Sequence, residues 1–251
     1  MTATGRDDRG PGVCVRLLDG FQLWVADRCV PVMPSSQRLL AYLALRDGAV
    51  TRAAVAAALW PEATERRAAA CLRSALWRLV KPPYALIEVR GALLGLHPQV
   101  DTDVDQVRRL ATGLADPRAH RTDPALPLAA LTAELLPGWT EPWVGIERDW
   151  VRQMSLRVLE TLSARFRSSG DHFRAHETAA AAVRSDPLRE SAHRRLIELH
   201  LADGNPAQAI RQYATYRSLL RRELGLSPSS EIRQLVRPIL SRTGSAPAGA
   251  D

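Results

Sequence analysis

The sequence contains few cysteines and no long apolar segment. Its 251 residues include three cysteines, Cys14, Cys29 and Cys71, an odd number without the C-x-x-C spacing of common metal sites. This pattern disfavours a secreted disulfide framework and is typical of a reducing compartment. No eighteen consecutive apolar residues occur, and residues 1–12 lack the apolar centre of a signal peptide. We therefore expect a soluble cytoplasmic protein with no membrane partner.

Aromatic residues and lysine are also scarce. The chain has 6 Trp, 4 Tyr and 3 Phe, so its 46% hydrophobic content is mainly Ala, Leu and Val. These residues suit closely packed helices and disfavour a mostly β fold. Among the 34 basic residues the only lysine is Lys81, which leaves 33 arginines. Such a bias follows partly from a GC-rich genome, so the net charge of +7 is weak support for a polyanionic partner.

The distribution of charge is more informative than its total. Residues 1–105 hold 13 basic and 11 acidic residues, a balance of +2, while the remainder has a balance of +5. Residues 64–90 nevertheless combine six basic residues with only Glu65 and Glu88. The six are Arg66, Arg67, Arg73, Arg78, Lys81 and Arg90. A local cluster of this kind indicates an anionic partner better than the total charge does.

The first part of the chain has the pattern of a small sheet followed by helices. Residues 13–32 alternate in polarity and are interrupted by two turn sequences, which predicts two or three short strands. Ser35 or Ser36 is expected to cap a first helix that ends before Gly48. Thr51 is expected to cap a second helix, which Pro61 ends.

A third helix is predicted from a Thr64 cap through Val80, because Pro82-Pro83 forbids continuation. At about 100° per residue, its apolar and polar side chains fall on opposite faces. The predicted core face contains Ala69, Leu72, Leu76, Leu79 and Val80. The opposite face contains Arg67, Ala70, Ser74, Trp77, Arg78 and Lys81. Two apolar runs at 85–89 and 92–96 then flank Arg90-Gly91 and predict a β-hairpin.

This order of elements is that of a winged helix, which binds double-stranded DNA through the major groove and the adjacent backbone. The predicted recognition surface comprises Arg66, Arg67, Arg73, Ser74, Trp77, Arg78 and Lys81. Arg90 would lie at the tip of the wing, and Ser35 and Arg38 are placed for phosphate contact at the first helix. As alternatives, Ser35 is simply an N-cap, and the arginines are a solvated helix face. The order of elements favours DNA binding.

Trp77 is unusual on a polar helix face. A large exposed aromatic side chain commonly marks a contact surface, so Trp77 either touches a thymine methyl group or sugar, or packs within the protein. We favour internal packing against the wing or the second domain.

From Asp103 onward the pattern is almost wholly helical, with a proline-containing loop at 116–128 and resumed periodicity at 128–136. Gly170 and Gly204 are 34 residues apart, the tetratricopeptide period. Each glycine is followed by matching small or packing residues, namely Ala175 and Ala182, and Ala209 and Tyr216. We therefore predict an α-helical repeat domain. The predicted boundaries are a disordered tail at 1–12, a winged-helix domain at 13–102, the helical domain at 103–241 and a disordered tail at 242–251.

Longer segments identify a family. The segments RLLDGFQLWV, SSQRLLAYLAL, ALWPE and CLRSALWRL occur in the order expected of an OmpR-type winged helix of the SARP family. The segments ELLPGWTEPWVGIERDWVRQ and SDPLRESAHRRLIELHLADGNPAQAIRQYATYRSLLRRELGLSPSSEIRQL resemble the bacterial transcriptional activator domain. Trp139, Trp143 and Trp150 lie in the first of these, at spacings that place them near one helical face, and we expect them to pack in the core.

The resemblance implies a transcriptional activator of secondary metabolism that binds direct repeats upstream of promoters, as a homodimer on DNA, and recruits RNA polymerase holoenzyme. The alternative is a helical-repeat scaffold with a degenerate winged helix that does not bind DNA. No G-x-x-x-x-G-K-[ST] motif is present, and we expect no enzyme activity and no cofactor.

Polar clusters offer weak support for catalysis. His97, Asp101, Asp103 and Asp105 could supply metal ligands, but capping of a helix that begins near Asp105 is the more ordinary role. His172 and His176 are expected to be solvated side chains on a repeat helix. Cys71 is expected to be half-buried packing.

Overall fold

A computed structural model describes residues 12–80, 85–115 and 127–243, and it divides the chain into two compact units. The first, here called the winged-helix unit, comprises Met1–Arg109 and Ala133–Val151. The second, the helical unit, comprises Leu110–Thr132 and Arg152–Asp251. Within the described ranges, no helix has the length and apolar character needed to cross a membrane. The predicted tails lie almost wholly outside the described residues, as does most of the predicted loop at 116–128.

The winged-helix unit begins with a four-stranded sheet in the order β3-β2-β1-β7. Its strands are β1 (Val13–Arg16), β2 (Gln22–Val25), β3 (Arg28–Val30) and β7 (Val100–Thr102). The first three are antiparallel and confirm the strands predicted in 13–32. Strand β7 pairs in parallel with β1, a contact between distant parts of the sequence that local patterns do not indicate.

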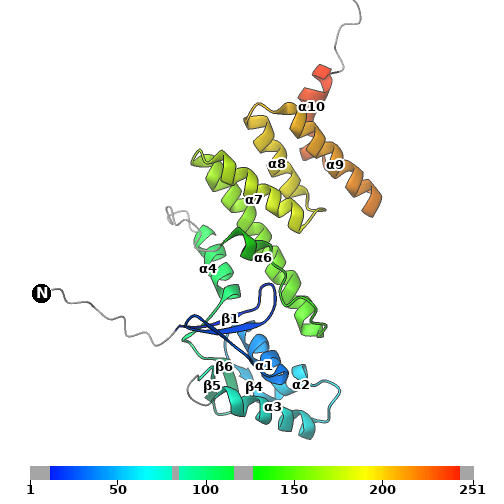
Figure 1. Ribbon diagram of the computed structural model, residues 1–251. Helices are drawn as coiled ribbons and strands as arrows, with labels where there is room; N and C mark the ends of the chain where they lie inside the picture. The colour runs from blue at the N-terminus through cyan, green and yellow to red at the C-terminus, as the bar shows by residue number, and fades with distance from the viewer. Residues whose placement is uncertain (1–11, 81–84, 116–126, 244–251) are drawn as a thin grey trace, which may run out of the picture. The chain divides into compact units, whose positions relative to one another are not determined.

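Three helices and a second, three-stranded sheet complete the winged helix, with strand order β4-β6-β5 (Figure 1). These elements are α1 (Pro34–Ala44), β4 (Val50–Thr51), α2 (Arg52–Leu59), α3 (Glu65–Leu79), β5 (Ile87–Arg90) and β6 (Leu93–Leu96). The predicted hairpin is confirmed, and the unpredicted two-residue strand β4 joins it to the start of α2. This β4 contact fixes the wing beside the helices.

Two of the three predicted N-cap positions are right, those of Thr51 and Thr64, and only Thr51 makes a side-chain capping bond. Thr51 accepts a hydrogen bond from the Ala54 amide and caps α2, as expected. Helix α1 begins earlier than predicted, at Pro34 after Met33, so neither Ser35 nor Ser36 is its N-cap. Proline suits the first turn because its missing N–H needs no partner there. Thr64 precedes α3 but makes no side-chain capping bond.

The apolar side of α3 is buried largely as predicted. Leu72, Leu76 and Leu79 are almost fully buried, together with Ala68 and Ala75. The prediction was wrong for Val80, which lies beyond the helix end and is 36% exposed. Because these buried side chains pack into the core, the opposite, basic face of α3 is exposed to solvent.

Asp103 has a structural role that the sequence did not reveal. Helix α4 (Asp103–Ala115) begins two residues before the predicted start, and the Asp103 carboxylate accepts hydrogen bonds from the backbone amides of Leu17, Leu18 and Val104. Burial raises the pKa of this carboxyl group, and the backbone bonds offset part of that rise. Asp103 therefore ties the end of β1 to α4.

Residues 133–151 pack within the winged-helix unit. The helix predicted for 128–136 is limited to α5 (Leu128–Thr132), because residues 134–136 instead exchange backbone hydrogen bonds with the segment after β1. The Arg148 guanidinium donates to the carbonyls of Leu135, Leu136 and Trp139, which holds this turn together. Glu147 also pairs with Arg46 beyond the end of α1 at 2.7 Å.

The three tryptophans of this segment do not share one helical face. Helix α6 (Pro142–Ser168) begins after Trp139, so Trp139 lies outside it. Trp143 is buried and packs edge-on against Tyr42 and Trp139, which confirms the core role for this pair. The prediction was wrong for Trp150, which is 42% exposed and lies beneath the Arg108 guanidinium at 5.0 Å.

The helical unit has the predicted repeat. It is built from the second part of α6, then α7 (His172–Ser185), α8 (Glu190–Ala202), α9 (Pro206–Leu224) and α10 (Ser230–Thr243). Gly170 and Gly204 lie between the helices of each pair with positive φ, a conformation that favours glycine. Ala175 and Ala209 are fully buried at the equivalent packing positions, which confirms the tetratricopeptide-like reading.

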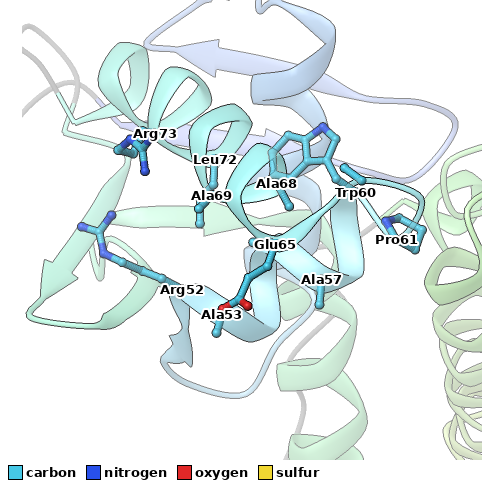
Figure 2. Close-up of a pocket in the computed structure, with 12 residues that line it drawn as sticks. Arg52, Ala53, Ala57, Trp60, Pro61, Glu65, Ala68, Ala69, Leu72 and Arg73 are labelled. Carbon is cyan, nitrogen blue, oxygen red and sulfur yellow. The ribbon is translucent and has the colours of Figure 1, made fainter.

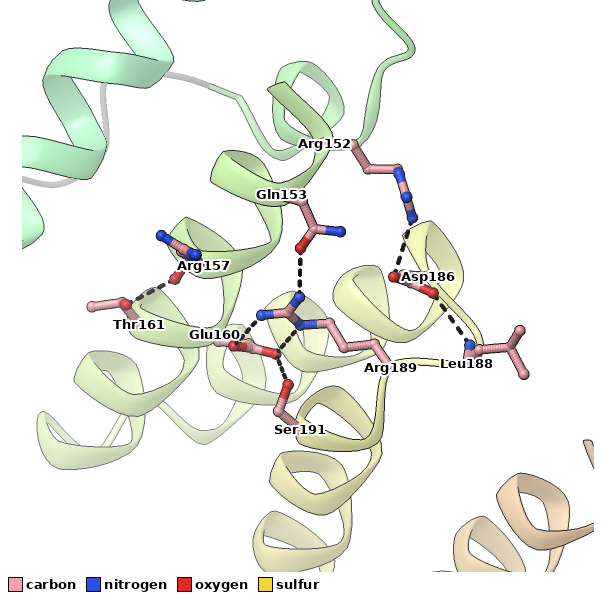
Figure 3. Close-up of polar contacts among 9 residues, drawn as sticks. All are labelled: Arg152, Gln153, Arg157, Glu160, Thr161, Asp186, Leu188, Arg189 and Ser191. Atoms are coloured by element: carbon pink, nitrogen blue, oxygen red, sulfur yellow. Dashed lines mark hydrogen bonds and ion pairs between the residues drawn. The ribbon is translucent and has the colours of Figure 1, made fainter. Parts of the chain in front are cut away.

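An ion-pair network joins α6 to the turn between α7 and α8 (Figure 3). Arg189 donates from Nε to Glu160 Oε1 at 2.7 Å and from Nη1 to Gln153 at 2.9 Å, and Ser191 donates to the same Glu160 oxygen. Burial alone would raise the pKa of Glu160, but the bonds from Arg189 and Ser191 lower it overall. The network fixes the angle at which the second helix pair follows the first.

The histidines of α7 are paired rather than simply solvated. His172 Nδ1 lies 3.1 Å from Asp203 Oδ1, and His176 Nε2 lies 2.6 Å from Asp203 Oδ2. The prediction missed this because Asp203 is 27 residues beyond His176 and is brought close only by the helix repeat. In the part of the chain that the structure describes, no group of three or more His, Cys, Asp or Glu side chains is placed to hold a metal ion.

Candidate nucleic-acid interface

The exposed face of α3 is strongly basic. Six predicted recognition residues on this helix are all exposed: Arg66, Arg67, Arg73, Ser74, Trp77 and Arg78. Lys81 lies outside the described residues. Leu72 and its buried neighbours face the opposite way, so packing of the core orients the arginines outward. A helix presenting arginines in this way has the size and donors to read base edges in the major groove.

These arginines are not neutralised in the way that Arg38 and Arg46 of the same unit are. Among the described residues, no ion pair is made by Arg66, Arg67, Arg73 or Arg78. The acidic residue of α3 is Glu65, which lies in the first turn, where the helix dipole stabilises a carboxylate. Four cations on one short helix face repel each other, so an external anion would stabilise them.

Trp77 lies on the same face and is 61% exposed. Most of the residue is therefore in solvent, although we expected it to pack internally. Ser74, one turn earlier, donates its hydroxyl to the Ala70 carbonyl at 3.2 Å. An exposed aromatic ring between arginines is suited to apolar contact with a thymine methyl group or a sugar.

Arg90 lies at the end of β5, directly before the wing turn at Gly91. Its side chain is 70% exposed and pairs with Glu88 on the same strand at 2.8 Å. Glu88 thus partly neutralises the one predicted wing cation. Contact with a phosphate would have to compete with this exposed, weak pair.

The two predicted phosphate contacts on α1 are not presented as expected. The Arg38 guanidinium donates to the Leu59 carbonyl at 3.1 Å and lies 2.9 Å from Glu141, so it is engaged within the winged-helix unit. Ser35 is half-buried inside the helix, and the neighbouring Ser36 is buried and donates to the Ala75 carbonyl of α3. The start of α1 therefore supports α3 instead of forming an exposed anion site.

One further arginine, Arg52, lies beside the wing and α3, and it is not among the candidate site residues predicted from the sequence. Arg52 is the first residue of α2, and its Nε donates to the Gly91 carbonyl at the wing turn, at 3.4 Å. It lines the same pocket as Arg73 of α3 (Figure 2). The available signal was its position directly after the Thr51 cap, where the backbone N–H groups of a helix favour anions.

Comparison with known proteins identifies the class. The family model of the bacterial transcriptional activator domain matches residues 102–240. The chain is 30% identical over 220 residues to the regulatory protein AfsR of Streptomyces coelicolor and 29% identical to that of Streptomyces griseus, covering 82% of this chain in each case. It spans only 22% of the length of either relative.

A solved structure of Mycobacterium tuberculosis EmbR in complex with a low-affinity phosphopeptide shares the fold, with a TM-score of 0.68 and 22% identity. The match covers 95% of this chain and 67% of that one. The chain therefore belongs to the bacterial transcriptional activator domain family, as a regulator of the SARP type in which a winged helix precedes a tetratricopeptide-like domain.

Proposed function

We propose that this protein is a sequence-specific DNA-binding activator of transcription. The observation on which this rests is the set of exposed arginines on α3 that make no ion pair with the described residues. In this account Arg66, Arg67, Arg73, Ser74, Trp77 and Arg78 contact the major groove, together with Lys81. Arg90 and Arg52 hold the DNA backbone beside the wing, because both lie at the wing turn.

The proposal extends to how activation is achieved. Two copies bind direct repeats upstream of a promoter as a homodimer on DNA, and they recruit RNA polymerase holoenzyme. The repeats would be spaced by one or two turns of the DNA, since α3 of each protein copy must enter the major groove from the same side. The protein would then act in the cytoplasm at the nucleoid, on genes of secondary metabolism.

A footprint on the intergenic region nearest its own gene tests the DNA-binding part. We expect protection of two directly repeated segments, centred about 10–11 or 21–22 base pairs apart. Absence of protection at low salt, with capture of a protein partner by the helical repeat, would favour the scaffold alternative.

Transcription in vitro with purified RNA polymerase holoenzyme tests the activation part. Added protein should increase transcript from the footprinted promoter and not from one with scrambled repeats. Binding without an increase would reject activation while leaving DNA recognition in place.

A further inference from the structure

A pocket of about 730 Å³ lies between α2 and α3, beside the proposed recognition surface (Figure 2). Its lining consists of six alanines together with Arg52, Trp60, Pro61, Glu65, Leu72 and Arg73. Small-molecule sites commonly have volumes of about 300–1,000 Å³ and apolar walls with a few polar groups. The pocket has the size and composition of such a site.

Alanine creates the space in this pocket. Ala53 and Ala57 lie one turn apart on α2, and Ala69 lies opposite on α3, where longer side chains would close the gap between the helices. Trp60 and Pro61 form one end of the lining (Figure 2). Water in such a space finds few hydrogen-bond partners, so an apolar group that displaces it gains free energy.

The basic groups are at the other end. Figure 2 shows Arg52 from α2 and Arg73 from α3 on the side away from Pro61. The bond of Arg52 to Gly91 uses Nε and leaves its two terminal amino groups without a bond to that carbonyl. Glu65 is the single acidic residue of the lining. The combination suits a ligand with an apolar body and one anionic group at the arginine end.

We propose that this pocket binds a small organic anion with an apolar body, and that the bound anion competes with DNA. Competition follows because Arg73 belongs both to the pocket and to the proposed recognition surface. This second part rests on the proposed function. A DNA phosphate could use the two arginines but would leave the alanine floor uncovered, so the apolar floor favours an amphipathic small molecule.

Titration of the full chain with 1-anilinonaphthalene-8-sulfonate tests the site, because this probe is an apolar anion that fluoresces when water is excluded. The variant Ala53→Phe/Ala57→Phe fills the pocket from exposed positions of α2 and should weaken probe binding by about tenfold or more. Ala54→Phe places the same ring on α2 at an exposed position outside the lining and should leave affinity unchanged. Equal affinity in all three proteins would overturn the site.

Charge recognition is tested separately. The double variant Arg52→Gln/Arg73→Gln should weaken binding of the anionic probe by about tenfold. Its affinity for the neutral dye N-phenyl-1-naphthylamine should not change. Equal loss of both dyes would mean that the helices no longer pack correctly, and no loss of either would overturn the anion preference. This glutamine double variant keeps the proposal testable if the phenylalanine variant fails to fold.

Competition is measured by adding the footprinted DNA to the probe complex. Release of the probe in proportion to bound DNA supports the proposal, and DNA that binds without releasing it overturns competition. If no DNA binds at all, the proposed function and the competition fall together, while the dye titrations still decide whether the pocket is a site.

Discussion

The arginines on α3 differ from the arginines that join helices in the helical unit. In the helical unit Arg189 pairs with Glu160, Arg152 with Asp186, and Arg194 with Glu231. On α3 of the winged-helix unit, Arg66, Arg67, Arg73 and Arg78 make no ion pair within the described residues. The helical unit thus uses these three arginines to hold its elements together, while α3 presents a local cationic surface.

This contrast shows that the positions of the charged residues are more informative about DNA binding than the net charge is. Total charge attracts any polyanion, but a set of unneutralised guanidinium groups on one helix can contact bases and phosphates in a fixed register. The predictions below separate these two uses of arginine.

Removal of a recognition arginine should have the largest effect. Arg78→Ala is expected to weaken binding to the footprinted repeat by about 1–3 kcal/mol and to relax specificity at one base position. Fluorescence anisotropy on a panel of single-base variants measures this. Unaltered affinity and an unaltered base preference would remove Arg78 from the recognition surface.

Removal of a structural arginine should lower stability and spare DNA affinity. Arg189→Ala leaves the Glu160 carboxylate, which is 20% exposed, without its main partner, and should cost about 1–2 kcal/mol of unfolding free energy. Urea unfolding followed by circular dichroism measures the change. Arg184→Ala, at an exposed position of α7, is the matched control and should change stability little.

The helical unit should also lose stability in mild acid. His193 is buried, bonds to the Pro187 carbonyl and Gln212, and its pKa is lowered by burial. A histidine with a lowered folded pKa stabilises above its unfolded value of about 6.5, and this contribution is lost as pH falls further. The slope attributable to one histidine is at most about 1.4 kcal/mol per pH unit.

Glu160 extends the loss to lower pH, because its lowered pKa gives stability that is present above about 4.3 and lost below. When the pH is lowered from 7.5 to 3.5, the unfolding free energy should therefore decrease over two separate pH ranges, one due to His193 and one due to Glu160. The variant His193→Gln should flatten the upper range only. A stability that rises between pH 6.5 and 5.5 in the wild-type chain would contradict the role given to His193.

The wing should give the smallest effect. Arg90→Ala is expected to weaken binding to all DNA sequences alike and to reduce the slope of log affinity against log salt concentration by about 1. Glu88→Gln, which releases Arg90 from its ion pair, should act in the opposite direction. A sequence-dependent loss in Arg90→Ala would instead assign it a base contact.

Local signals predicted the fold where the partners are near in sequence. Thr51 caps α2, and Gly170 and Gly204 end helices, because capping and left-handed backbone depend on neighbouring residues. Strands β4 and β7 were missed since each is two or three residues long and depends on a distant strand. Pro34 moved the start of α1 and removed the expected serine cap.

The candidate site followed the same rule. Helical periodicity placed Arg67 and Arg78 on the exposed face correctly, because one buried stripe determines the opposite side. Arg38 was misplaced since its partners, Leu59 and Glu141, are far along the chain. Arg52 was missed because its relation to Arg73 and Gly91 arises only when α2, α3 and the wing pack together.

Two double variants that remove the same charge test the central claim most directly. Arg73→Ala/Arg78→Ala removes two arginines from α3, and Arg211→Ala/Arg221→Ala removes two exposed arginines from α9. Fluorescence anisotropy on the footprinted repeat at one salt concentration should show a loss of about 2–6 kcal/mol for the first and little change for the second. Equal losses would show that total charge, and not the α3 surface, governs DNA binding.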